Sequence, residues 1–440
     1  MNRFKKLWRT LRSSFWFMPA WIVVASIAVA VVLINADYYG GTQWLNKWPL
    51  LFGAGADGAR GMMSTIAGSM MTVVGVTFSM ILVVLAMASS QYTSRILRNF
   101  TRSRVTQAVL GIFAGIFTYC LIVLRTIRSG DEGAFVPSLA VFFGFVLALA
   151  GVGALMFFIH HIASSIEASN IIASVAQETI AAIDRLFPEK LGQEPDENED
   201  RDTQCSLAER NWIAVPAKNS GYIQGVNNAA ILRLARDNKT MVRMELGIGE
   251  FVVQGTKLAS LALEDPPDEQ TIAALQSAFS ISNHRTVEQD AAFGIRQIVD
   301  VALKALSPGI NDTTTAVTCV DYLASILARV APLQIPSSHR FEDGELRVIA
   351  KGPSFESLLA ESFDQIRRSA KGDVVIMSRM LDALQLLASL TASPSRRRAL
   401  REQVRWIAEL AGRTIESAHD RAVIDRHLSR VFEAADVKSE

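Results

Sequence analysis

Residues 62–90 read MMSTIAGSMMTVVGVTFSMILVVLAMASS, a run without a charged side chain. A helix needs about 20 apolar residues to cross the hydrocarbon core of a bilayer, so this run is long enough. Small and hydroxyl side chains recur in it every three, four or seven residues and share one helix face. The stretch therefore predicts a membrane-spanning helix with one side that suits protein or water better than lipid. That side holds Ser64, Gly68, Thr72, Gly75, Ser79, Ala86 and Ser90.

Three further uncharged runs, at about 15–34, 105–124 and 135–159, complete a predicted membrane domain over residues 1–164. A signal peptide is the competing interpretation of the first run, but its apolar part is too long. Basic residues precede the first span and fill the short connection at 95–104, whereas the other connections carry few. The positive-inside rule then predicts a multi-pass protein of the bacterial inner membrane with both termini in the cytoplasm.

Charge divides the chain into two parts and excludes several function classes. Basic residues outnumber acidic ones by 13 to 4 through residue 164, whereas acidic residues outnumber basic ones by 39 to 31 afterwards. An acidic soluble part would be repelled by phosphate backbones, so we expect no nucleic-acid partner. Cys120, Cys205 and Cys319 lie far apart, which predicts neither a disulfide framework nor a metal site. No cofactor motif is present, and we expect no cofactor.

The rest of the chain predicts a stalk, a linker and two soluble domains. Apolar residues at helical spacing indicate a helical stalk at 165–188, and an acidic, polar linker follows at 189–206. Short β-type runs with turn residues predict a small all-β domain at 207–264, and a helical cytoplasmic domain follows at 265–440. The pattern from Gly249 to Leu258 resembles the barrel-sandwich hybrid of biotinyl and lipoyl carrier domains, but Glu264-Asp265-Pro266-Pro267 replaces the modified lysine.

Two polar stretches of the helical domain are candidates for sensing a ligand. One contains Arg285 and Asp290, and the other is the loop Ser307-Pro308-Gly309-Ile310-Asn311-Asp312. A loop that leads into a helix N-terminus can bind an anion, but the same residues also serve as helix caps. Three roles remain open for these residues: helix capping and domain packing, sensing of a small anion, and catalysis. Because no hydrolase, metalloprotease or nucleotide-binding motif is present, we expect that the chain is not an enzyme.

These motifs, together with Ser90-Gln91, Arg95-Ile96-Leu97-Arg98-Asn99-Phe100 and Leu110-Gly111-x-Phe113, resemble a family of bacterial predicted membrane proteins. The family is known as domain of unknown function family twenty-two fifty-four, and the resemblance covers nearly the whole chain. It implies four spans and a cytoplasmic C-terminal region, and it supplies no reaction. In the family pattern a proline usually follows the Asn-Asp pair, where this chain has Thr313.

Taken together, the sequence favours a homo-oligomeric channel that passes inorganic ions passively. The spans carry no ionisable residue, which argues against a coupled transporter but permits a passive pore. The small-residue face of 62–90 would line the pore, with Arg95 and Arg98 at its inner mouth favouring anions, and the cytoplasmic domains would form a gating or sensing collar. Two alternatives remain: the face only packs against a neighbouring helix, or the protein is a membrane-anchored scaffold or sensor that binds a partner or a small anionic ligand.

Overall fold

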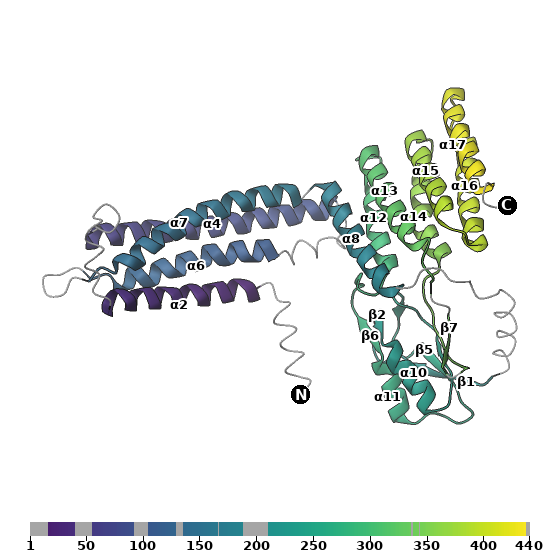
Figure 1. The fold of residues 1–440 in the computed structure, drawn as a ribbon, viewed down its shortest axis with the longest axis horizontal. Helices are drawn as coiled ribbons and strands as arrows, with labels where there is room; N and C mark the ends of the chain where they lie inside the picture. The colour runs from purple at the N-terminus through teal and green to yellow at the C-terminus, as the bar shows by residue number, and fades with distance from the viewer. Residues whose placement is uncertain are drawn as a thin grey trace. The chain divides into compact units, whose positions relative to one another are not determined.

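The computed structural model describes residues 16–39, 55–91, 104–128, 135–165, 167–187, 210–335, 338–342 and 344–436. Within them the chain forms two compact units that divide between Glu167 and Ala168. The first unit contains helices that are long and apolar enough to cross a membrane, which confirms the four spans predicted from the sequence. They are α2 (Phe17–Tyr39), α4 (Ala56–Gln91), α6 (Arg104–Thr126) and α7 (Ser138–Ser165) (Figure 1).

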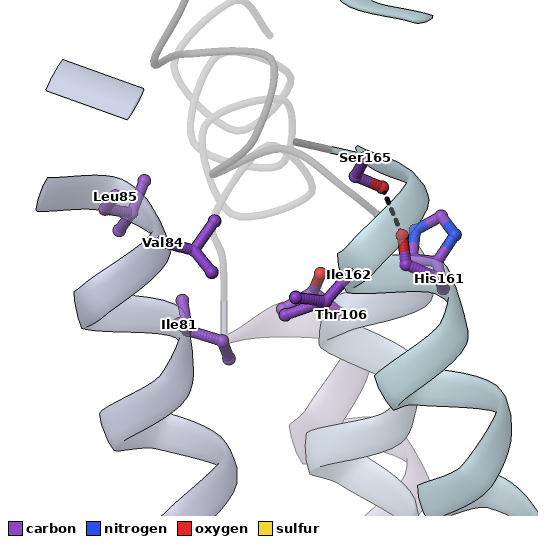
Figure 2. Close-up of a pocket in the computed structure, with 7 residues that line it drawn as sticks. All are labelled: Ile81, Val84, Leu85, Thr106, His161, Ile162 and Ser165. Atoms are coloured by element: carbon purple, nitrogen blue, oxygen red, sulfur yellow. Dashed lines mark hydrogen bonds between the residues drawn. The ribbon is translucent and has the colours of Figure 1, made fainter. Parts of the chain in front are cut away.

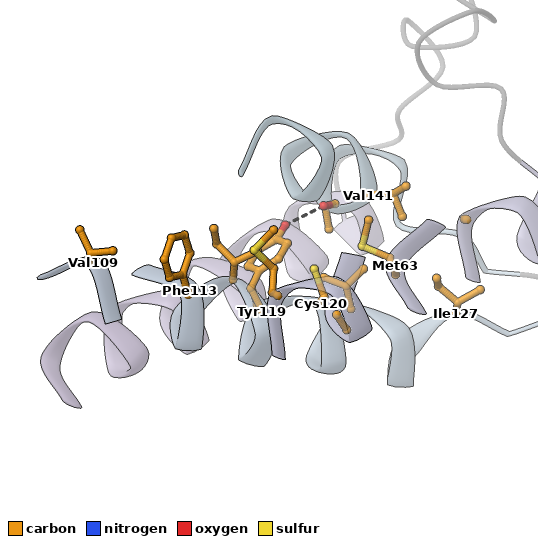
Figure 3. Packing of buried hydrophobic residues seen from close by; sticks show 14 of the residues in the cluster. Met63, Val109, Phe113, Tyr119, Cys120, Ile127 and Val141 are labelled. Carbon is orange, nitrogen blue, oxygen red and sulfur yellow. Dashed lines mark hydrogen bonds between the residues drawn. The ribbon is translucent and has the colours of Figure 1, made fainter. Parts of the chain in front are cut away.

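Helix α6 is the centre of the first unit. It packs against α2, α4 and α7, and half of its most apolar segment is buried, against 11–17% in the other three helices. Its side chains Phe113, Tyr119 and Cys120 are completely buried (Figure 3). The Tyr119 hydroxyl donates a 2.7 Å hydrogen bond to the carbonyl of Ala140 in α7. The other helices turn most of their apolar surface outward, as expected of helices surrounded by lipid.

Glycines on α7 allow α4 to approach it closely. A Cβ on Gly144 would lie 2.8 Å from the Met63 methyl carbon, and a Cβ on Gly151 would lie 3.4 Å from the Met70 sulfur. Both pairs are separated by seven residues on each helix, so the contact continues along one seam. At these positions the glycines leave room for the methionine side chains of α4, and such small residues favour helix association in a membrane.

Helix α2 extends past its predicted end and carries a buried carboxylate in its last turn. Asp37 is 8% exposed, and its two oxygens accept hydrogen bonds from the backbone nitrogens of Leu139 (3.2 Å) and Ala140 (3.1 Å). These amides belong to the first turn of α7, where N–H groups have no partner within the helix. The run predicted at 15–34 contains no ionisable residue, and Asp37 lies in the part of α2 that extends beyond this run, where it caps α7.

In the second unit, helices form two neighbouring rows (Figure 1). One row contains α12 (Ala291–Ala305), α14 (Phe355–Ser369) and α16 (Pro394–Thr414). The other contains α13 (Thr313–Val330), α15 (Val374–Leu390) and α17 (Ala418–Asp436). Successive helices pack along each row as in α-solenoids, where every repeat contacts mainly its neighbours.

Helix α8 (Ala168–Leu186) occupies the region predicted as a stalk. It begins anew after the end of α7 at Ser165, and its buried face packs against α12 and α13. The approach to α12 is close, because a Cβ on Gly294 would fall 1.9 Å from the Thr179 hydroxyl oxygen. The apolar pattern thus predicted a helix correctly, but the structure places this helix inside the second unit and shows no continuous helix from α7.

Two sheets enclose the other core of the second unit. The five-stranded sheet has the order β1-β5-β3-β8-β7 and the three-stranded sheet the order β4-β2-β6, with all pairs antiparallel except β3 and β8. Side chains of both sheets share one buried cluster, as in a sandwich. The strands are β1 (Trp212–Pro216), β2 (Gly221–Val226), β3 (Val242–Met244), β4 (Phe251–Val252), β5 (Lys257–Ala262), β6 (Phe279–Ser282), β7 (His339–Glu342) and β8 (Glu345–Ile349).

The β region extends beyond the limit at residue 264 that the sequence predicted. Strands β6, β7 and β8 come from the part expected to be helical, and two short helices, α10 (Asn228–Asp237) and α11 (Glu269–Ser277), cover the sheets. These strands have four or five residues, too few for a clear alternation of apolar and polar side chains. Strands β6 and β8 pair with β2 and β3, which lie much earlier in the sequence, and β7 pairs with β8 in a hairpin. Local patterns do not reveal the distant partners.

We predict that Asp37→Ala destabilises the first unit by about 1–2 kcal/mol, because two amides of α7 lose their acceptor in a buried site. Asp37→Asn keeps one oxygen acceptor and should cost less. The measurement is unfolding of the full-length protein in mixed detergent micelles with rising dodecyl sulfate, followed by circular dichroism. Asp57→Ala, at an exposed position of the first turn of α4, serves as the control and should have little effect. Equal midpoints for Asp37→Ala and wild type would contradict the capping role.

Candidate functional site

The small-residue face of α4 points away from its own helix bundle. Every described candidate for pore lining is exposed, and the candidates are Ser64, Gly68, Thr72, Gly75, Ser79 and Ala86. The residues that α4 buries against the bundle lie on its opposite side and include Ala59, Met63, Met70, Thr77 and Val84. The candidate face is therefore covered by no other described helix of its own unit. Ser90 belongs to α4, but its side chain lies outside the described residues.

This face repeats every seven residues. Gly61, Gly68 and Gly75 form one line, and Thr65, Thr72, Ser79 and Ala86 form a second line one turn along. A Cβ added to any of the three glycines would meet nothing within 4 Å. A seven-residue repeat keeps the same face toward a partner along the whole helix and favours a left-handed crossing. Gly61 and Thr65 were not among the sequence candidates, although the seven-residue spacing could have included them.

Two hydroxyls on this face donate hydrogen bonds within their own helix. The Thr65 hydroxyl donates to the Gly61 carbonyl (2.8 Å) and the Thr72 hydroxyl to the Gly68 carbonyl (3.0 Å). A hydroxyl that donates in this way still has acceptor capacity on its oxygen. The exposed face therefore offers oxygen acceptors between flanks of exposed apolar side chains such as Val76 and Val83. The two inner-mouth candidates, Arg95 and Arg98, lie outside the described residues.

Arg285 and Asp290 form a bidentate ion pair at the start of α12. The Arg285 Nε and Nη2 atoms donate to the two carboxylate oxygens at 2.8 and 3.0 Å. Asp290 is 4% exposed and also caps α12 by accepting from the Phe293 amide at 3.0 Å. Gly249 adopts a φ of +86°, and a Cβ there would lie 2.5 Å from an Asp290 oxygen. The pair thus joins the β region to α12 and leaves little open surface for a ligand.

The loop with Ser307, Asn311 and Asp312 lies at the other end of α12. Asp312 caps α13, because its oxygens accept from the Thr315 amide (3.0 Å) and the Thr315 hydroxyl (2.6 Å). Asn311 adopts a positive φ of 50°, and the Ser307 hydroxyl donates to the Lys304 carbonyl. Helix α12 has 15 residues and is about 22 Å long, so the loop and the ion pair are not one site. The five ligand-sensing candidates therefore separate into two groups.

Hydrogen bonding affects the pKa of one of these groups. The Thr315 hydroxyl and amide hold the pKa of Asp312 below its usual value, because they stabilise the charged carboxylate. Thr313, which replaces the proline of the family pattern, donates from its hydroxyl to Asp373 at 3.3 Å. Asp373 in turn caps α15 through the Ile376 amide. Within the described part of the chain, no three His, Cys, Asp or Glu side chains are grouped so as to hold a metal ion.

These observations define an integral membrane protein with a spanning helix bundle and a large β and helical unit. The chain belongs to the family described as Predicted membrane protein (DUF2254), whose model matches residues 12–386. The resemblance inferred from the sequence motifs is thus confirmed. An uncharacterized protein of Mycobacterium bovis and one of Mycobacterium tuberculosis are each 31% identical to it over 99% of this chain and 83% of their own length. No solved structure matches the chain.

We predict that Asp312→Ala destabilises the protein by about 1 kcal/mol at neutral pH, because α13 loses its N-cap. The folded pKa of Asp312 is lowered, so its stabilising effect is complete above the ordinary aspartate pKa of about 4 and disappears as the pH falls through the lower folded value. The difference between wild type and variant should therefore shrink in acid. Thermal unfolding of the full-length protein across pH measures it. In a Thr315→Val background the pH-dependent part of this difference should be smaller and its loss complete at a higher pH, because the folded pKa of Asp312 moves back toward its ordinary value. A pH-independent difference would contradict the assignment.

Proposed function

We propose that the protein is a homo-oligomeric channel of the bacterial inner membrane that passes inorganic ions passively. Copies of α4 surround the pore, and both termini lie in the cytoplasm. The observation that carries the proposal is the outward direction of the small and hydroxyl face of α4, opposite to the face that packs on its own bundle. A helix that faced only lipid there would gain more from bulky apolar side chains, such as those on its flanks. The proposal includes no catalytic step.

The dimensions of the face support a pore. From Gly61 to Ala86 it extends about 37 Å along the helix, longer than the hydrocarbon core of about 30 Å. Because the pattern repeats every seven residues, identical helices around an axis present the same small face inward from Gly61 to Ser79. The next position of the glycine line is Leu82, which is 51% exposed. A continuous uncharged wall with oxygen acceptors can conduct ions without any ionisable residue.

Two features, one on α4 and one in the segment between α4 and α6, favour ions of opposite charge. The exposed hydroxyl oxygens of Thr65 and Thr72 are acceptors, which suits cations. Arg95 and Arg98 follow α4 in the sequence and attract anions at the cytoplasmic mouth. The oxygens would act in the narrow part and the arginines at the entrance, so the reversal potential in a salt gradient identifies the dominant feature.

The second unit is suited to act as a gating or sensing collar. Only residues 166 and 167 separate the end of α7 from the start of α8. Helix α8 packs tightly on α12 and α13, so a movement of the helical rows would pull directly on α7.

A membrane-anchored scaffold or sensor is the second candidate, and the two rows of helices favour it. Stacked helical repeats present extended surfaces that bind partner proteins. Binding of a small anionic ligand is less well supported than binding of a partner protein, because Arg285, Asp290 and Asp312 already make contacts within the chain. The scaffold predicts that binding by residues 168–440 persists without the membrane helices and that no current flows.

We predict that purified full-length protein conducts in planar bilayers under voltage, membrane tension or pH change. Ser79→Leu should lower the unitary conductance by roughly tenfold, because a bulky apolar side chain in a narrow pore favours dewetting. Gly75→Leu should act in the same direction. Val76→Leu is the matched control, because Val76 is 62% exposed on the apolar flank of the same turn.

Two results would overturn the channel. The first is the absence of conductance under all three stimuli from protein that is folded and oligomeric. The second is conductance that Ser79→Leu and Gly75→Leu leave unchanged, since the current would then pass elsewhere.

A further inference from the structure

A cavity lies between α4, α6 and α7, at the end of the bundle where the connection from α4 to α6 begins and ends (Figure 2). Part of it is open to the surroundings. Figure 2 shows the α4 side chains on one side of the opening, across from those of α6 and α7. The lining residues are Ile81, Val84 and Leu85 of α4, Thr106 of α6, and His161, Ile162 and Ser165 of α7.

The cavity arises where the close seam between α4 and α7 ends. Met63 and Met70 lie against Gly144 and Gly151, in steps of seven residues. One step further along α7 the glycine is replaced by Phe158, which is completely buried. A large ring fills the space that a glycine leaves open to a neighbouring helix. The next step brings Val84 and Ser165 to the cavity wall.

The walls indicate an apolar occupant. Four of the seven lining side chains are aliphatic, and the Ser165 hydroxyl already donates to the His161 carbonyl at 2.6 Å. A buried water needs two to four polar partners, and apolar cavities stay dry. The medium around these helices is the bilayer, whose acyl chains can enter an opening between helices. An acyl chain therefore fits the cavity better than water does.

The polar rim and the local charge identify the headgroup. Thr106, His161 and Ser165 are the polar lining residues. Arg104, exposed in the first turn of α6, lies two residues before Thr106. The sequence between α4 and α6, residues 92–103, contains three arginines and no acidic residue. Basic clusters beside spanning helices attract anionic lipid headgroups.

We propose that this cavity is a lipid site that holds an acyl chain of an anionic phospholipid, with the headgroup near Arg104 and the histidine end of α7. The site does not depend on the channel, because it lies within one subunit and on the side of α4 that packs on its own bundle. It would anchor the end of α4 through Ile81, Val84 and Leu85.

The test uses native mass spectrometry of delipidated full-length protein titrated with dioleoyl phosphatidylglycerol or dioleoyl phosphatidylcholine. Wild type should retain phosphatidylglycerol preferentially. Ile162→Trp fills the cavity and should weaken retention by about tenfold or more, because each methylene that is driven out loses its apolar contact. Ile159→Trp is the matched control, because Ile159 is 47% exposed on the same helix whereas Ile162 is 7% exposed. Arg104→Gln should reduce the preference for phosphatidylglycerol and leave retention of phosphatidylcholine unchanged.

Leu85→Trp fills the cavity from the opposite wall and serves if Ile162→Trp does not fold. Unchanged retention in a folded cavity-filling variant overturns the site. Equal retention of both lipids by wild type overturns the anionic headgroup.

Discussion

A helix in a bilayer satisfies its own backbone hydrogen bonds, so only the shape and chemistry of its side chains decide what lies beside it. In the first unit this constraint acts through small residues. Gly144 and Gly151 bring α7 against the methionines of α4, and α6 fills the centre with large side chains such as Phe113 and Tyr119. Helix α4 uses one face for these contacts and leaves a second face of glycines and hydroxyls exposed. The proposed assembly follows from that second face.

In both units, aspartate side chains accept hydrogen bonds from backbone amides at helix N-termini. Asp37 caps α7, Asp290 caps α12, Asp312 caps α13 and Asp373 caps α15. A helix start leaves amides without partners, and a carboxylate is the strongest local acceptor for them. Motifs that look suited to ligand binding in the sequence can therefore arise from the needs of helix ends. The Arg285–Asp290 pair adds a contact between the β region and the helical rows to this role.

The sequence predicts the fold where the signal is local. Long uncharged runs identified the four spans, and apolar spacing identified α8 as a helix. It does not predict β8, whose partner β3 lies about one hundred residues earlier, or the burial of Asp37, which depends on the approach of α7. For the candidate site, the periodicity of α4 placed Gly68, Thr72, Gly75 and Ser79 on one face. The three-dimensional packing was needed to show that no other helix of the bundle covers this face. The cavity near Ile162 is formed by three helices, so no single stretch of sequence predicts it.

The insertion of β7 and β8 between α13 and α14 has a consequence for how the chain is made. Strand β8 pairs in parallel with β3, so the five-stranded sheet stays incomplete until residue 349 has left the ribosome. During that interval β3 presents an unpaired edge, which is a template for aggregation. Nascent chains halted between α13 and β8 should therefore depend on chaperones more than chains halted after α14. Synthesis of this protein thus has a vulnerable period set by its topology.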